Sequence, residues 1–172
     1  MPPVTLCDAP KSSLLQSLRA GGSYTDCFAT EVAISVSQSD YVEAFYTTTL
    51  FKAERLVIRL LASTNSTDHE ARELALGMRD TFAVWSVAQR LPNQVLLTDR
   101  TGRTSSWLMS EAGIASTKLY FGSAINTRVN AITGQREMSI GFRALAGFHD
   151  WYSRRLLQAA ARRLIAGRAS LK

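Results

Sequence analysis

The sequence predicts an α+β fold in which a curved antiparallel β-sheet wraps a long C-terminal helix. Three observations lead to this prediction. Apolar and polar residues alternate with a period of two over much of residues 81–126, which is typical of antiparallel strands. Apolar residues then recur with the helical period across residues 141–167, enough for about seven turns. Shorter helical patterns precede the strands, so helices and strands are segregated along the chain, as in α+β proteins.

The first half of the chain predicts one strand, at residues 24–36, and several short helices. The helices are expected at residues 11–19, at residues 41–62 as a bent pair, and at residues 68–76. The bend in the pair is expected at residues 47–49, because three consecutive threonines interrupt the helical pattern there. Ser66 or Thr67 can cap the last helix, and Gly77 can end it.

Turn residues divide the second half into successive strands, expected at residues 81–91, 94–99, 103–110 and 117–126. Pro92 and Asn93 supply one turn, and Thr101 and Gly102 supply another. The polar residues 128–139 form either a last hairpin arm or a loop over the mouth of a pocket.

The long helix presents one apolar stripe, which we expect to pack on the sheet. Its members are Phe142, Leu145, His149, Tyr152, Leu156 and Ala160. His149 is the polar exception. One interpretation is a core histidine that is hydrogen-bonded to a backbone carbonyl. The other is an imidazole directed into a cavity between helix and sheet, where it can donate, accept or transfer a proton.

Length and composition indicate a single domain spanning residues 1–172, with residues 1–22 as an N-terminal lead-in. The chain is 46% hydrophobic and 20% charged, a globular composition. No apolar run is as long as the roughly 18 residues of a transmembrane helix, and the N-terminus does not resemble a secretory signal. Cys7 and Cys27 lack metal-binding spacing. We therefore expect reduced thiols in a cytoplasmic protein, with a single bridge between them left open.

The net charge of +6 is concentrated near the C-terminus. Residues 142–172 hold seven basic residues and one acidic residue, and the remainder of the chain is neutral in total. One interpretation is a solvated helix face with cations at the negative end of the helix dipole. The other is a docking patch for an acidic partner, an anionic membrane or nucleic acid. The arginines are spread around the helix, which favours the first.

Three strings carry a resemblance to a known superfamily: YVEAFYTTTLFKAERLVIRLL at 41–61, TDRTGRTSSWLM at 98–109 and TKLYFGSA at 117–124. Together with the order of the elements, they resemble an uncharacterised bacterial family of the START and polyketide-cyclase (SRPBCC-like) superfamily. The resemblance covers roughly residues 24–164. It implies a helix-grip fold, with a curved sheet around the C-terminal helix and a cavity that often holds an apolar or amphipathic small molecule.

Motifs for metals, nucleotides and nucleophilic serines are missing from the sequence. It contains no phosphate loop, dinucleotide fingerprint, H-E-x-x-H pair, Cys/His cluster or G-x-S-x-G elbow. We therefore expect neither a metal nor a cofactor. Cys27 and His149 are considered as a nucleophile and base, but no third group accompanies them.

The candidates for the cavity wall are Trp85, Arg103, Trp107, Tyr120, His149 and Tyr152. Tyr46 could add a further hydroxyl group. The tryptophans would supply flat apolar walls, although both fit a core equally well. Arg103 either pairs with Asp99 across the intervening turn or binds a carboxylate or phosphate group of the ligand.

The function expected from these observations is binding of a small hydrophobic or amphipathic ligand between the sheet and the C-terminal helix. One alternative is a cyclase, dehydratase or hydrolase that uses His149 with a tyrosine as acid and base. Another is an interaction domain that uses the basic helix. We expect no specific nucleic-acid binding and no membrane span, and a homodimer is left open.

Overall fold

The computed structural model describes residues 3–53, 55, 66–126, 128–129, 136–137 and 140–169; within 128–148 it describes the backbone alone. The strands are β1 (Thr5–Leu6), β2 (Tyr24–Val32), β3 (Thr81–Phe82), β4 (Trp85–Leu91), β5 (Gln94–Asp99), β6 (Thr104–Ala112), β7 (Thr117–Ile125), β8 (Arg128–Val129) and β9 (Arg136–Glu137). The helices are α1 (Leu15–Ala20), α2 (Gln38–Tyr46), α4 (Asp68–Ala75) and α5 (Ile140–Ala169).

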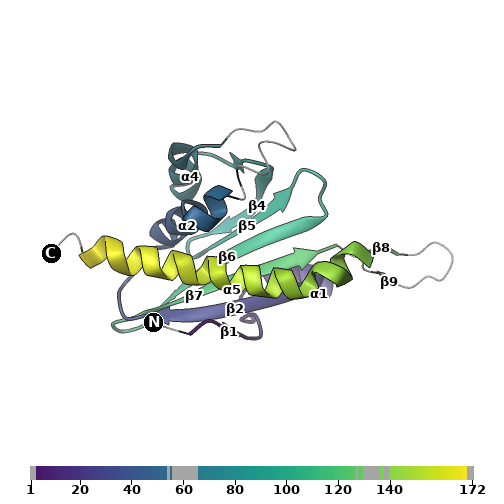
Figure 1. The fold of residues 1–172 in the computed structure, drawn as a ribbon, viewed down its shortest axis with the longest axis horizontal. Helices are drawn as coiled ribbons and strands as arrows, with labels where there is room; N and C mark the ends of the chain where they lie inside the picture. Colours follow the sequence, from purple (N-terminus) through teal and green to yellow (C-terminus); the bar gives the residue numbers. More distant parts are fainter. Residues whose placement is uncertain are drawn as a thin grey trace.

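The main sheet contains seven strands in the order β1-β2-β7-β6-β5-β4-β3, and every neighbouring pair is antiparallel. β2 and β7 lie side by side, although 84 residues of the chain separate the end of one from the start of the other. Helix α5 lies along β2 and β7 and contacts α2 (Figure 1). The fold is therefore α+β and helix-grip-like, as the sequence predicts.

Helix α5 is longer than the sequence predicts. It begins at Ile140 and continues through Gly167 to Ala169, so Gly167 does not end it. Leu156 and Ala160 are buried in the core under this helix, and Tyr152 packs against that core. The predicted contacts of Phe142 and Leu145 lie outside the described side chains.

Hydroxyl side chains cap the starts of α2 and α4. Ser37 accepts a hydrogen bond from the amide of Asp40 at the start of α2, and Thr47 is the C-terminal cap of that helix. Helical residues resume at 49, so the predicted bend at 47–49 is present, while residues 56–62 of that prediction lie outside the described part of the chain. Thr67 and Glu70 form a capping box at the start of α4.

One predicted strand is wrong. Residues 81–91 form two strands, β3 and β4, joined by a tight turn at Ala83 and Val84. Ala83 has a φ of 53°, in the left-handed region that two-residue hairpin turns require at their first central position. The sequence hides this turn, because an alanine occupies a position where Gly, Asn or Asp is usual. The first strand is also shorter than predicted, since β2 ends at Val32.

The sheet is covered on both faces. On the α5 face, helices α2, α4 and α5 bury one set of alternating strand residues, which includes Phe28, Leu108 and Phe121. On the α1 face, residues of the lead-in and α1 bury the other set, which includes Trp107 and Tyr120. The described part of the lead-in, residues 3–22, therefore belongs to the packed structure, and β1 extends the sheet.

A buried glutamine joins α1 to the sheet. The Oε1 atom of Gln94 accepts hydrogen bonds from the amide of Leu14 and from Nε1 of Trp107, both at 2.9 Å. Its Nε2 atom donates to the carbonyl of Ser12 at 3.0 Å. Gly122 leaves room for α1, because a Cβ atom there would lie 2.7 Å from a methyl group of Leu15.

Candidate functional site

A cavity of about 330 Å³ lies between the first half of α5, helix α2 and the adjoining ends of β6 and β7. It is lined by Phe45, Tyr46, Phe51, Trp85, Thr104, Ser105, Ser106, Phe121, Ser123, Ala124, Ile125, His149, Tyr152, Ser153 and Leu156. Aromatic rings form much of the wall, and a few hydroxyl groups and one imidazole interrupt it. This combination of apolar walls and few polar groups is typical of sites for small molecules, and the volume is near the lower end of their range.

Ser123 and His149 belong to the cavity wall, and both lie next to Asp26, which does not line the cavity itself. Antiparallel register places Asp26 of β2 directly opposite Ser123 of β7. Oδ1 of Asp26 accepts hydrogen bonds from the hydroxyl of Ser123 at 2.7 Å and from its amide at 2.9 Å. Oδ2 of Asp26 lies 3.2 Å from Nδ1 of His149, which comes from α5. The carboxylate is 9% exposed and the imidazole 30%, so water screens this pair only partly.

The distances decide where the serine proton points. The hydroxyl oxygen of Ser123 lies 2.7 Å from Asp26 but 3.4 Å from Nε2 of His149. Because the hydroxyl has a single proton, it donates to the carboxylate and not to the imidazole. Nδ1 of His149 can donate to Oδ2 of Asp26. The group is therefore a carboxylate–imidazole pair with a supporting serine, and Ser123 is not held as a nucleophile.

Two further polar groups in the wall are buried without a hydrogen-bond partner among the described residues. They are the indole Nε1 of Trp85 and the hydroxyl of Ser153. Most buried polar groups in proteins are hydrogen-bonded, and leaving one unpaired costs about 1–3 kcal/mol. The hydroxyl of Tyr46 lies 3.4 Å from that of Ser106. Both Trp85 and Ser153 belong to the cavity lining.

The structure divides the six predicted site residues into three that line the cavity, two on the other face of the sheet, and Arg103, which lies in an exposed turn. Trp85, His149 and Tyr152 line the cavity together. Trp107 and Tyr120 are buried on the α1 face, on the other side of the sheet. Cys27 also lies on that face, which separates it from His149.

Tyr120 has a structural contact of its own. Its hydroxyl donates to Glu111 at 2.7 Å, and burial together with this hydrogen bond raises the pKa of Tyr120. Neither this tyrosine nor Trp107 borders the cavity.

Arg103 lies in the exposed turn between β5 and β6, and it does not line the cavity either. Asp99 and Arg103 meet, as predicted, but through the arginine amide, which donates to the carboxylate at 2.9 Å. The hydroxyl groups of Thr101 and Thr104 also donate to Asp99. Burial raises the pKa of Asp99, but these hydrogen bonds outweigh it and hold that pKa below its usual range.

Sequence reasoning missed Asp26, Ser123 and Ser153. A signal for Asp26 exists: Asp26 and Phe28 share one face of the first strand, so an acidic residue occurs in line with a core position. Ser123 and Ser153 carry no comparable signal, because serine is common on both buried and exposed surfaces.

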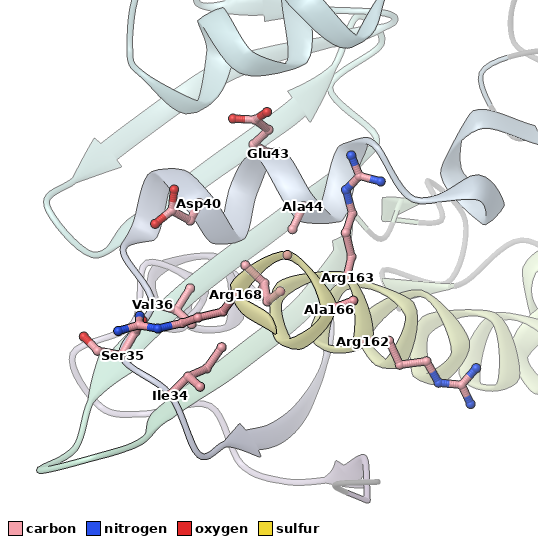
Figure 2. Close-up of a pocket in the computed structure, with 12 residues that line it drawn as sticks. Ile34, Ser35, Val36, Asp40, Glu43, Ala44, Arg162, Arg163, Ala166 and Arg168 are labelled. Carbon is pink, nitrogen blue, oxygen red and sulfur yellow. The ribbon is translucent and has the colours of Figure 1, made fainter. Parts of the chain in front are cut away.

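A second hollow, of about 1170 Å³, lies where the last turns of α5 pass α2 and the segment after β2 (Figure 2). Acidic side chains, Asp40 and Glu43, and basic ones, among them Arg163 and Arg168, line it together. Arg168 already donates to the carbonyl of Ser35 at 2.7 Å. This hollow is larger than the cavity, but its mixed charges select no ligand class, so the cavity remains the candidate site.

Arg154 makes its contacts within the protein. It donates hydrogen bonds to Asp150 and to the carbonyl of Val4, and its guanidinium carbon lies 5.1 Å from the centre of the Phe28 ring. Arg155 lies over the ring of Trp151 at 5.9 Å. Part of the basic charge of α5 is therefore engaged within the protein.

The described residues contain neither a membrane-spanning helix nor a metal-binding cluster. No helix among them is long and apolar enough to cross a membrane. Within the same ranges, no three His, Cys, Asp or Glu side chains are grouped as a metal site would require.

Comparison with known proteins identifies no family. No protein-family model matches the sequence, and no curated protein matches it. Among solved structures, the conserved protein of unknown function EF2215 from Enterococcus faecalis is 16% identical, over 87% of this chain and 80% of that one, with a TM-score of 0.36. CalU16 from Micromonospora echinospora is 10% identical, over 98% of this chain and 96% of that one, with a TM-score of 0.32.

Proposed function

We propose that this chain binds a small hydrophobic or amphipathic molecule in the cavity between α5, α2 and the sheet, in the manner of START and polyketide-cyclase proteins. One observation carries the proposal. The cavity is walled largely by aromatic rings, and its lining includes Trp85 and Ser153, whose indole Nε1 and hydroxyl have no hydrogen-bond partner among the described residues. A ligand with an apolar body and one or two hydrogen-bonding groups complements such a wall.

Mass spectrometry of gently purified protein under native conditions tests this proposal. We expect the wild-type chain to retain a small molecule, or to gain thermal stability from a panel of aromatic and aliphatic acids and alcohols. Ser153→Leu fills the cavity and should abolish both effects. Ala166→Leu is the matched control, because Ala166 is exposed on the same helix.

The proposal fails if wild-type protein retains no molecule and no member of the panel raises its melting temperature. It also fails if folded Ser153→Leu binds as well as wild type, because the ligand would then lie elsewhere. Circular dichroism of both variants establishes that they are folded.

An acid–base enzyme is the second candidate, because of the carboxylate–imidazole pair. Asp26 holds one nitrogen of His149, and the ring lines the cavity beside Tyr152. An oriented imidazole with a nearby phenol can move protons to and from a substrate, as cyclases, dehydratases and hydrolases require. This candidate needs turnover that is lost in His149→Ala while binding and folding persist. Turnover unchanged in that variant removes it.

A further inference from the structure

Two cysteine thiols face each other across β1 and β2. The register pairs Thr5 with Ala29 and Leu6 with Phe28, so the next step along β1 brings Cys7 opposite Cys27. The amide of Cys7 donates to the carbonyl of Cys27 at 2.9 Å, and the two Sγ atoms are 3.5 Å apart. Directly opposed residues of antiparallel strands have Cα atoms about 4.5–5.5 Å apart, within the range that disulfides span. A bridge therefore needs little backbone movement.

A third hollow brings solvent to these thiols. It has a volume of about 410 Å³, and its lining includes both Cys7 and Cys27. Asp8 and Arg19 also border it, and their side chains are largely exposed. Cys7 is partly exposed, whereas Cys27 is buried. A reagent that enters this hollow therefore meets Cys7 first.

The two thiols also differ in reactivity. Burial, followed by the neighbouring thiol of Cys7, raises the pKa of Cys27 far above its usual range. Since the thiolate is the attacking form, Cys27 is a poor first nucleophile. It becomes effective once a partner sulfur is held next to it, because attack is then intramolecular.

We propose that Cys7 and Cys27 are a redox-sensitive pair that small disulfides such as oxidised glutathione convert into an intramolecular bridge. The thiolate of Cys7 attacks one sulfur of oxidised glutathione, the S–S bond of the oxidant breaks, and one glutathione leaves and takes up a proton. Cys27 then loses its proton and attacks the sulfur of Cys7, and the second glutathione leaves. Two protein thiols are oxidised to one disulfide, and one oxidised glutathione is reduced to two glutathione molecules.

The bridge would fasten the lead-in to the sheet. Cys7 and Cys27 are 20 residues apart, and the loop they close contains α1, which covers Trp107 and Gly122. Cross-linking a loop of this length restricts the unfolded chain. For a chain of this size, the melting temperature should rise by roughly 6–12 °C on oxidation and return on reduction.

The test treats the reduced full chain with oxidised glutathione and follows free thiols, intact mass and melting temperature. Wild type should lose both thiols and two hydrogens, with no disulfide between chains and no glutathione retained. Cys27→Ser should accumulate a mixed disulfide at Cys7. Cys7→Ser should keep Cys27 unmodified under the same conditions.

Several results would overturn the proposal. Wild-type protein could keep both thiols in excess oxidant, it could retain a glutathione adduct on Cys7, or it could form disulfides between chains. Each of these outcomes contradicts the proposal. Equal reactivity of Cys27 in Cys7→Ser and of Cys7 in Cys27→Ser would also contradict the order of attack. If Cys27→Ser does not fold, wild type and Cys7→Ser still decide, since the partly exposed position tolerates serine.

Discussion

Replacing Asp26 with asparagine removes the charge of the carboxylate and keeps its shape. Asparagine has one oxygen, which can still accept from the amide and hydroxyl of Ser123. Its NH₂ group then faces Nδ1 of His149, where the wild-type carboxylate lies at 3.2 Å. An Nδ1–H group cannot donate to that NH₂ group, so the variant loses the hydrogen bond to the charged carboxylate in a largely buried setting. Such bonds contribute about 1.5–3 kcal/mol.

We therefore expect Asp26→Asn to lower the free energy of unfolding by about 2 kcal/mol, which corresponds to roughly 4–8 °C in melting temperature. Asp26→Ala should cost more, about 3–5 kcal/mol, because it also removes the oxygen that accepts from both the amide and the hydroxyl of Ser123. Urea titration at pH 7 measures both values. If the slope of the unfolding free energy against urea concentration is unchanged, the substitution has altered stability alone.

Asp80→Asn is the matched control. Asp80 is 78% exposed and its nearest cation, Arg90, lies 4.0 Å away, so the exchange should change stability by less than about 0.5 kcal/mol. If Asp26→Asn is as mild as Asp80→Asn, the carboxylate–imidazole pair does not hold α5 to β2, and the acid–base candidate loses its oriented histidine.

Three further predictions concern packing, pH and charge. Leu156→Asp places an unpaired carboxylate in the core and should lower the free energy of unfolding, measured in urea, by more than about 4 kcal/mol. Ala166→Asp, on the exposed face of the same helix, should lower it little. Equal effects of the two substitutions would contradict the packing face of α5. The lowered pKa of Asp99 stabilises the fold above the unfolded-state value near 3.9, and this contribution is lost as pH falls through the folded pKa. Wild type should therefore lose more stability than Asp99→Asn between about pH 5 and pH 2, and parallel curves would refute this. We also expect no binding to DNA or anionic vesicles at 0.15 M salt, where screening acts over about 8 Å. Binding at that salt that disappears in the double variant Arg155→Ala, Arg162→Ala would show that α5 has a partner.

Local signals in the sequence predict much of the fold. The long helix, the bend at Thr47 and the cap at Thr67 follow from residues close together in the chain, where periodicity and hydroxyl side chains act over a few positions. The turn at Ala83 could not be predicted from such local signals. Its left-handed conformation is imposed by the pairing of Phe82 with Trp85 and not by the residue type.

The site depends on a different kind of information. Trp107 and Leu108 are consecutive and both fully buried, so hydrophobicity cannot tell which of them faces α5. Period-two alternation identifies the inner face only when the other face meets water, and here the lead-in covers it. Asp26 and His149 are 123 residues apart in the chain, and they meet because β2 pairs with β7 and α5 lies over both. The carboxylate on β2 therefore meets the histidine on α5 only after β2 has paired with β7. A measured coupling between Asp26 and His149 would thus support the strand order of the sheet as well as the proposed ion pair.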